Sequence, residues 1–406
     1  MSGMYIERHI ETVIEQLLEQ YKVILVTGPR QVGKTTLLKH SLAETHHYVS
    51  LDDVQALNLA LDDPALFFLN YEPPVVIDEV QYAQSLFRQI KLLVDQSDRK
   101  GTVVLTGSQA YHLMQNVTES LAGRIAILEM SGLSLREIDA TNRRTPFIPD
   151  ASFVGNASKI KSTKELWKRI HRGSMPELQN PKIDWDTYYR NYVRSYIERD
   201  VRSRIALKDE NLFYKFLVAL AARTGQLFNA NSIAGDIGVT LKTIQSWSSI
   251  LEASGTVRFI RPYFDNVNKQ LIKTPKPYFM DCGLVCHLLG WNTPGVLERG
   301  AMAGPIFETF VVSEILKSYL NAGEDARNIF FYRDVQKREI DLLIKRGDIL
   351  YPVEIKKSAT PTKEMVNSFS VLKSLNIHVG AGALACLAHE SSYLTQDTIT
   401  IPVDAI

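Results

Sequence analysis

Residues 23–42 read VILVTGPRQVGKTTLLKHSL, and this stretch decides the fold of the first part of the chain. The run VILVT (23–27) is short, apolar and rich in β-branched residues, which predicts a buried strand. The segment GPRQVGKT (28–35) fits the pattern G-x-x-x-x-G-K-[ST], and the residues after it predict a helix. A strand, a glycine-rich loop and a helix in this order predict a loop whose backbone N–H groups surround phosphate oxygens.

The residue types of this loop suit phosphate binding. Glycines let the backbone approach the phosphates, Lys34 would reach the β- and γ-phosphates, and Thr35 would offer its hydroxyl to Mg²⁺. A glycine-rich turn with a solvated lysine is the plainer interpretation, but the strand before the loop and the helix after it favour a nucleotide site. The predicted nucleotide-binding residues are Gly28, Pro29, Arg30, Gln31, Val32, Gly33, Lys34, Thr35 and Thr36.

Further strand-like runs follow, with helical stretches between most of them. They are HYVSLDD (47–53), PVVIDEV (74–80), TVVLTGS (102–108) and IAILEM (125–130). Alternating strands and helices predict a parallel sheet covered by helices, and hence an α/β fold.

Polar residues end two of these strands. Asp78 and Glu79 follow an apolar run, at the strand end where ligands bind in open α/β sheets. Asp78 would hold Mg²⁺ and Glu79 would polarise the attacking water, which favours a hydrolysing enzyme over a small-molecule kinase. Ser108 or Thr106 could contact the γ-phosphate or that water. For these last two residues, an ordinary strand end followed by a turn is an equally good interpretation.

The first 140 residues resemble an AAA-type P-loop ATPase, on the motifs GPRQVGKTTLL, VSLDD, VIDEVQ, LTGSQ and SLAGR. The whole chain resembles an uncharacterised bacterial and archaeal family that joins this ATPase to a C-terminal region of unknown function. The further motifs are YIERDVR, PYFDNVNKQLIKTPKPYFMDCGL, GPIFETFVVSEI and VEIKKS.

This resemblance implies ATP and Mg²⁺ as cofactors, with Lys34 and Glu79 as catalytic residues and Ser108 as a sensor of the phosphate. Many relatives carry a second serine where Gln109 stands, which leaves the sensor contact open. Arg124 stands where such ATPases often place an arginine that senses phosphate or reaches a neighbouring copy, a role that suits a guanidinium. A surface arginine is the equally good alternative, and a homo-oligomer stays open.

The overall composition indicates no membrane or secreted protein. Lys and Arg number 46 against 45 Asp and Glu, so contact with nucleic acid would need local basic patches. No apolar stretch approaches the roughly 18 residues of a membrane span, and the N-terminus is not a signal peptide. The three cysteines are too few for a disulfide framework, so we expect them to be reduced packing residues in a cytoplasmic protein.

The middle of the chain predicts a winged-helix-like module. Residues 231–239 and 240–247 predict two helices joined by a tight turn that contains glycine, and a strand and a basic segment follow. Such a module either contacts nucleic acid or packs against other domains, and the sequence alone leaves both open. The candidate nucleic-acid contacts are Lys242, Thr243, Gln245, Arg258, Arg261, Lys269 and Lys273.

The C-terminal part predicts a nuclease-like site. If Gly347 and Asp348 form a two-residue hairpin turn, Asp341 lies opposite Glu354, and Lys356 lies on the same face. Glu308, on a predicted helix, could add a third carboxylate. Two or three acids that hold a metal, with a lysine, resemble the PD-(D/E)xK nuclease core. Salt-bridged surface pairs and a degenerate domain that only binds are the alternatives.

The sequence thus predicts four parts. They are a P-loop ATPase core with a parallel sheet (1–140), a linker and helical region (141–225), a winged-helix-like module (226–295) and a C-terminal α/β nuclease-like domain (296–406). The leading hypothesis is an ATP-hydrolysing enzyme that acts on nucleic acid, DNA in preference to RNA, and whose C-terminal domain binds or cleaves it. The alternative is a nucleotide-controlled switch or scaffold whose C-terminal domain binds a protein partner.

Overall fold

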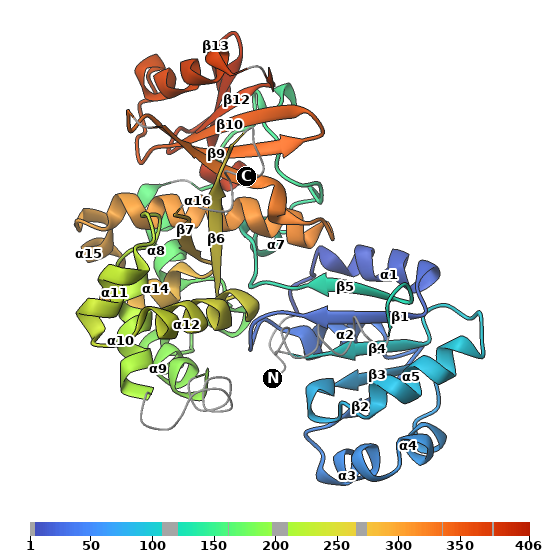
Figure 1. Ribbon diagram of the computed structural model, residues 1–406. Coiled ribbons are helices and arrows are strands. Elements are labelled where there is room, and N and C mark those ends of the chain that lie inside the picture. Colours follow the sequence, from blue (N-terminus) through green and yellow to red (C-terminus); the bar gives the residue numbers. More distant parts are fainter. Residues whose placement is uncertain are drawn as a thin grey trace.

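The computed structural model describes residues 5–107, 121–160, 162–196, 210–264, 274–334, 336–375 and 377–406. It is an α/β structure with a parallel sheet near the N-terminus, a cluster of helices in the middle and a mixed sheet near the C-terminus (Figure 1). None of the helices in these ranges is long and apolar enough to cross a membrane.

The N-terminal sheet has five parallel strands in the order β2-β3-β4-β1-β5, which confirms the predicted parallel sheet. The strands β1, β3 and β4 are buried along their whole length, as expected for a parallel sheet covered on both faces. The five strands are β1 (Val23–Thr27), β2 (His47–Ser50), β3 (Val75–Asp78), β4 (Val103–Thr106) and β5 (Ile125–Glu129).

The two faces of this sheet belong to different hydrophobic cores, because alternate side chains of a strand point to opposite faces. Ile24 and Val76 pack in a core that also contains residues of α1 and α2, whereas Leu25 and Ile77 pack in a core with α3, α4 and α5. The helices are α1 (Ile10–Gln20), α2 (Lys34–Ser41), α3 (Val54–Asp62), α4 (Pro64–Asn70), α5 (Leu86–Asp95) and α7 (Leu135–Ile138).

The core that contains Ile24 does not end at the ATPase-like sheet. It continues through the helical middle region and reaches the last residue, Ile406. The segment after α7, which was expected to begin a linker, is part of this core, since Phe147 and Phe153 are fully buried in it. The first and last parts of the chain are therefore packed together and not only tethered.

The middle region is helical, and its helices pack around aromatic side chains. Trp247 on α12 lies 5.4 Å from Phe213 and 5.6 Å from Phe216, both on α10, between ring centroids. The three cysteines are free and buried, as expected of packing residues. The helices are α8 (Thr163–Arg172), α9 (Trp185–Tyr196), α10 (Glu210–Ala221), α11 (Ala230–Ile237), α12 (Leu241–Ala253), α14 (Cys282–Leu288) and α15 (Pro294–Arg299).

Within the described residues, the C-terminal sheet has nine strands. Eight of them follow the order β13-β14-β12-β10-β9-β8-β6-β7, and β11 pairs with β10. The strands from the middle region are β6 (Val257–Pro262) and β7 (Lys276–Phe279). The others are β8 (Ile329–Arg333), β9 (Glu339–Arg346), β10 (Ile349–Ile355), β11 (His378–Val379), β12 (Gly382–Cys386), β13 (Ser392–Thr395) and β14 (Thr398–Pro402).

Strand β6 connects the middle region to this sheet. Its first part pairs with β7, and its last residues, Arg261 and Pro262, pair in parallel with Phe330 and Phe331 of β8. The strand predicted as part of a separate wing therefore also forms part of the C-terminal sheet (Figure 1).

Helix α16 (Ala303–Asn321) lies between the ATPase-like domain and the C-terminal sheet. It is buried at nearly every position from Ile306 to Asn321. A helix that is apolar on most sides needs cover on most sides, and here the mixed sheet, the helical region and the ATPase-like domain provide it. Short 3-10 helices complete the chain: η1 (Val80–Tyr82), η2 (Ala151–Phe153), η3 (Pro176–Gln179), η6 (Ala326–Asn328), η7 (Lys363–Ser374) and η8 (Val403–Ala405).

Candidate functional site

The glycine-rich loop lies at the carboxyl end of β1 and leads directly into α2. Gly28 has φ 136°, and a Cβ atom there would lie 1.9 Å from the carbonyl oxygen of Met130. Any other residue would clash with that backbone, so the loop requires glycine at this position. The side chain of Lys34 folds back over the loop, where its Nζ donates to the carbonyl oxygens of Gly28 (2.9 Å) and Pro29 (2.7 Å).

Asp78, at the end of β3, accepts hydrogen bonds from three hydroxyl groups. Thr35 Oγ1 on α2 and Tyr48 OH on β2 donate to its Oδ2, at 2.8 and 2.6 Å. Thr106 Oγ1 on β4 donates to its Oδ1 at 3.1 Å. This arrangement brings together Thr35 and Asp78, the two residues predicted to hold Mg²⁺. Both supply the oxygen ligands that Mg²⁺ prefers, so they fit this ion.

Glu79 is held in an unusual backbone conformation, with φ 58°. Few residues other than glycine adopt this conformation, and it occurs often at functional sites. Burial raises the pKa of the Glu79 carboxyl, and a hydrogen bond from Gln81 opposes this rise. A carboxylate with a raised pKa is a better proton acceptor near neutral pH, which suits activation of water.

The remaining predicted catalytic residues are Ser108 and Arg124. Ser108 lies outside the described residues. Arg124 precedes β5, whereas the glycine-rich loop follows β1, and these two strands run in parallel with Val23 beside Ile125. Arg124 is therefore at the opposite end of the strands, roughly 20 Å along them from the start of the loop. There it pairs with Asp95, which corrects the prediction that it senses phosphate in its own chain. A role toward a neighbouring copy stays a prediction.

The sequence did not single out Tyr48. Its position in the run HYVSLDD indicated a strand, but nothing in that run linked it to Asp78. The link depends on β2 lying beside β3, where Ser50 is opposite Asp78 and Tyr48 is two residues earlier on the same face.

The structure shows that some candidate nucleic-acid contacts are exposed and that others are not. Lys242 and Gln245 are exposed on α12, and Arg261 is exposed on β6. Thr243 lies in the first turn of α12, and its hydroxyl forms a hydrogen bond of 2.8 Å with the hydroxyl of Thr240. Lys269 and Lys273 lie outside the described residues.

Arg258 does not lie on an open basic surface. It forms an ion pair with Glu129, the last residue of β5, beside the glycine-rich loop. The preceding turn packs against the same place, because a Cβ at Gly255 would lie 3.1 Å from Cδ of Pro29. The prediction that Arg258 contacts nucleic acid is therefore corrected: this arginine docks the middle region onto the ATPase-like domain.

The C-terminal hairpin has the predicted register. Ile349 lies opposite Arg346 and Val353 opposite Leu342, so the next pair in register is Asp341 and Glu354. Lys356 Nζ lies 2.6 Å from Glu354 Oε1 and 3.4 Å from Asp341 Oδ2. The backbone N–H of Ile355 also donates to Asp341 Oδ2, at 2.8 Å.

Glu308 on α16 joins this acidic cluster through different partners. Tyr278 OH donates to its Oε1 at 2.6 Å, and Lys276 Nζ lies 3.4 Å from the same oxygen. Lys276 also pairs with Glu339 at 2.5 Å and is almost completely buried. Lys276 is therefore held among acidic side chains and away from the protein surface.

Lysine side chains contact the carboxylates of the acidic cluster. Among the described residues, no group of three or more His, Cys, Asp or Glu side chains is placed to hold a metal ion. Two ammonium groups, those of Lys276 and Lys356, contact the carboxylates instead. The residues predicted as metal ligands therefore lie near one another, but lysines neutralise them.

The proximity of these acids changes their protonation. Burial, followed by repulsion from Asp341, raises the pKa of Glu354 to about 7, against an attraction to Lys356 that lowers it. Burial and Asp341 also raise the pKa of Glu308. The cluster therefore resists full ionisation at neutral pH.

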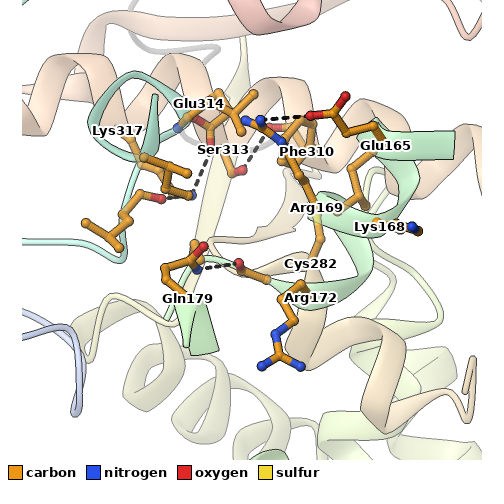
Figure 2. A pocket seen from close by; sticks show the side chains of 16 residues that line it. Glu165, Lys168, Arg169, Arg172, Gln179, Cys282, Phe310, Ser313, Glu314 and Lys317 are labelled. Carbon is orange, nitrogen blue, oxygen red and sulfur yellow. Dashed lines mark hydrogen bonds and ion pairs between the residues drawn. The ribbon is translucent and has the colours of Figure 1, made fainter. Parts of the chain in front are cut away.

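A cavity of about 240 Å³ lies between the ATPase-like domain, α8 and α16 (Figure 2). Its apolar lining includes Leu133, Ile170 and Phe310. The charged side chains in its wall include Arg169, which binds Asp139 and Glu165, and Lys317, which binds Glu314. The cavity therefore lies where the ATPase-like domain meets the helical middle region and α16.

Three family models match successive parts of the chain. Residues 20–139 match a model described as an AAA domain, residues 163–295 a domain of unknown function (DUF8612), and residues 303–406 a second domain of unknown function (DUF4143). Residues 20–139 are therefore similar to AAA-type P-loop ATPase domains. Nothing in the models assigns a function to the two domains that follow it.

Two curated relatives are uncharacterized proteins, Mb2031c of Mycobacterium bovis and Rv2008c of Mycobacterium tuberculosis. Each is 29% identical to this chain over 368 residues, which cover 89% of this chain and 76% of the relative. Among solved structures, the chain is similar to the Walker-type ATPase PABY2304 of Pyrococcus abyssi, with TM-score 0.39, 15% identity and coverage of 70% of this chain and 96% of that chain. It is also similar to the RuvB Holliday junction branch migration motor of Thermotoga maritima, with TM-score 0.30, 18% identity and coverage of 61% and 88%.

The raised pKa of Glu354 predicts a pH-dependent stability. Because its pKa is about 7 in the folded protein and near 4.5 when unfolded, the folded state binds the extra proton, and stability falls as pH rises from 4.5 to 7. We expect Glu354→Gln to remove this fall, by up to about 3 kcal/mol, in urea unfolding at pH 5 and pH 8. Glu19→Gln, on an exposed position of α1, is the control and should behave as wild type. Equal pH dependence in Glu354→Gln and wild type would contradict the assignment.

Proposed function

We propose that the N-terminal domain binds ATP and hydrolyses it with Mg²⁺. The observation that carries this proposal is the 2.8 Å contact between Thr35 and Asp78, because it places the hydroxyl of the loop beside the carboxylate that ends β3. Both groups would hold Mg²⁺, and the ion, when bound, neutralises charge on the phosphates.

The other residues of the site have distinct roles. The backbone of the glycine-rich loop binds the phosphates, and Lys34 leaves the carbonyls of Gly28 and Pro29 to contact the β- and γ-phosphates. Glu79 accepts a proton from the attacking water, helped by its raised pKa. Tyr48 and Thr106 orient Asp78 through their hydrogen bonds.

Lys34→Ala should abolish nucleotide binding while the fold stays intact, because the ammonium that contacts the phosphates is lost. We expect no measurable binding of Mg-ATP by calorimetry and no phosphate release. Lys100→Ala, which removes an exposed lysine of the same domain, is the matched control and should bind as wild type. Wild-type turnover in Lys34→Ala would refute the ATPase proposal.

Glu79→Gln should separate binding from hydrolysis. The amide cannot accept the proton of water, so we expect turnover to fall by roughly 10²-fold or more while Mg-ATP binding survives. Retention of unhydrolysed ATP after gel filtration measures this directly. If the variant retains no more ATP than the wild-type protein does, Glu79 is not the activating base.

We further propose that the C-terminal two-thirds of the chain contacts nucleic acid, with DNA as the expected partner. The observation that favours this is the exposed face of α12, which presents Lys242 and Gln245 on the second of two adjoining helices. Contact with phosphates requires exposed cations, and Arg261 on β6 adds a third candidate from a neighbouring strand. The alternative is a switch that binds a protein through this region.

Reversing one charge on α12 tests this proposal. Lys242→Glu should weaken binding to duplex DNA severalfold and reduce its salt dependence, measured by fluorescence anisotropy at several salt concentrations. Lys215→Glu changes the same charge on an exposed position of α10 and is the matched control. If both variants weaken binding equally, only overall charge matters, and α12 is not the contact surface.

We propose that the nuclease-like cluster of the C-terminal domain binds nucleic acid but does not cleave it. Its support is the pairing of the carboxylates with Lys276 and Lys356, whose ammonium groups lie directly beside the acids. We expect no cleavage of labelled duplex, single-stranded or branched DNA, or of RNA, in Mg²⁺ or Mn²⁺, with or without ATP. Cleavage by the wild-type protein that is lost in Asp341→Asn would contradict this and restore a metal-dependent nuclease.

A further inference from the structure

A buried arginine outside the predicted site, Arg8, hydrogen-bonds the backbone of the glycine-rich loop. Arg8 precedes α1, is 3% exposed and forms three hydrogen bonds through its guanidinium group. Its Nη1 donates to the carbonyl oxygen of Val32 at 2.8 Å, and its Nη2 to that of Ser131 at 2.8 Å. Its Nε donates to Glu137 Oε1 at 2.9 Å. One side chain therefore joins the loop to the segment that follows β5.

The contact with Val32 fixes the direction of a peptide group in the loop. In a trans peptide, the C=O of one residue and the N–H of the next lie in the same plane and point in opposite directions. Because Arg8 holds the carbonyl of Val32, the N–H of Gly33 points away from Arg8. The positive charge on the carbonyl side also polarises the peptide, which makes that N–H a stronger donor.

Glu137 anchors the arginine. Besides Arg8, its carboxylate accepts hydrogen bonds from the backbone N–H of His9 (3.0 Å) and from the N–H and hydroxyl of Ser134 (2.8 and 2.9 Å). Burial alone would raise the pKa of Glu137, but Arg8 and these donors outweigh burial and hold the pKa at about 2. The carboxylate is therefore ionised at neutral pH, and the position of Arg8 is fixed.

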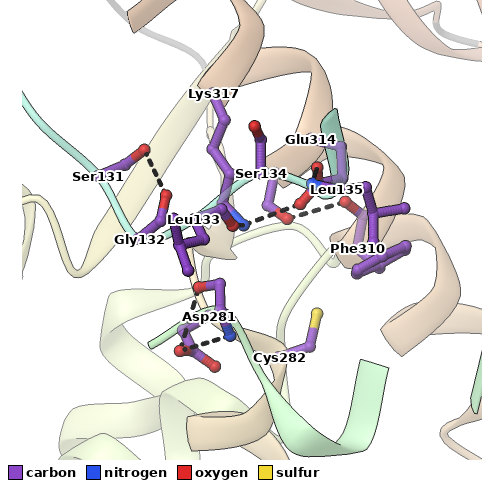
Figure 3. Close-up of polar contacts among 12 residues, drawn as sticks. Ser131, Gly132, Leu133, Ser134, Leu135, Asp281, Cys282, Phe310, Glu314 and Lys317 are labelled. Atoms are coloured by element: carbon purple, nitrogen blue, oxygen red, sulfur yellow. Dashed lines mark hydrogen bonds and ion pairs between the residues drawn. The ribbon is translucent and has the colours of Figure 1, made fainter. Parts of the chain in front are cut away.

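The anchoring segment is itself bound to the C-terminal half of the molecule (Figure 3). Glu314 on α16 accepts from the N–H of Leu135 at 2.7 Å, and Lys317 on the same helix donates to the carbonyl of Leu133 at 3.0 Å. The two side chains also pair with each other at 2.8 Å. On the other side of the segment, the N–H of Leu133 donates to the carbonyl of Ser174. The support behind Arg8 therefore comes from α16 and from the segment after α8.

We propose that Arg8 is a positioning residue for nucleotide binding: it orients the Val32–Gly33 peptide so that the N–H of Gly33 faces the phosphates. This inference rests on the proposed ATPase function. Arg8 touches neither nucleotide nor water in this role and acts only through the backbone of the loop. The backbone at Ser131 and the carboxylate of Glu137 hold it in place.

A purely structural role for Arg8 predicts different behaviour. If the arginine only satisfies Glu137, a variant that keeps a positive charge there loses stability, but its folded fraction binds nucleotide normally. If the arginine positions the loop, the folded fraction itself binds nucleotide more weakly. Nucleotide affinity and thermal stability must therefore be measured on the same variants.

Arg8→Lys keeps the charge for Glu137 but cannot reach all three partners with one planar group. We expect the Kd of Mg-ATP, measured by calorimetry on the folded protein, to rise roughly tenfold or more. Arg144→Lys is the matched control, because Arg144 is an exposed arginine that binds Glu7 and Thr12 near the same helix. The control should bind Mg-ATP as wild type does.

Chemical rescue supplies a second readout that does not depend on the stability of one variant. Arg8→Gly removes the side chain, and added ethylguanidinium should restore Mg-ATP affinity, whereas the same concentration of ethylammonium should not. Wild-type affinity in Arg8→Lys, or no recovery with ethylguanidinium in folded Arg8→Gly, overturns the role of Arg8. If the wild-type protein itself binds no Mg-ATP, the proposed function fails, and the role of Arg8 fails with it.

Discussion

The nucleotide site depends on the carboxylate of Asp78, which three hydroxyl groups from different elements share. Thr35 belongs to the helix after the glycine-rich loop, Tyr48 to β2 and Thr106 to β4. These hydrogen bonds tie the loop to three neighbouring parts of the sheet, so the order of the parallel strands determines the geometry of the site. Glu79 follows immediately, with a positive φ of 58°.

The site is not isolated from the rest of the chain, because one hydrophobic core joins one face of the ATPase sheet to the helical region and the C-terminus. Polar contacts reinforce this joint on both sides of the loop. Arg258 pairs with Glu129 next to the loop, while Glu314 and Lys317 of α16 hold the segment that anchors Arg8. Helix α16 also carries Glu308 of the acidic cluster. A single buried helix thus contacts both the ATPase-like domain and the acidic cluster.

The features that the sequence predicted were those with local causes. The buried strands and the glycine-rich loop follow from short residue patterns, and the turn at Gly347 was enough to place Asp341 opposite Glu354. The features that it missed depend on contacts between distant segments. Nothing near Lys276 indicates that acids from α16 and β9 surround it, and nothing near Arg8 indicates its bond to Val32. For the same reason the sequence offers Arg258 as a candidate nucleic-acid contact, although this arginine pairs with Glu129.

The most direct test of a nucleotide site that works together with the C-terminal domains is the rate of ATP hydrolysis with and without nucleic acid. Phosphate release would be followed at saturating Mg-ATP with duplex, single-stranded and branched DNA and with RNA, at low and at physiological salt. We expect at least one DNA to raise turnover severalfold and high salt to reduce that stimulation. Steady turnover that no nucleic acid changes would contradict a nucleic-acid ATPase and would favour a nucleotide-controlled switch that binds a protein.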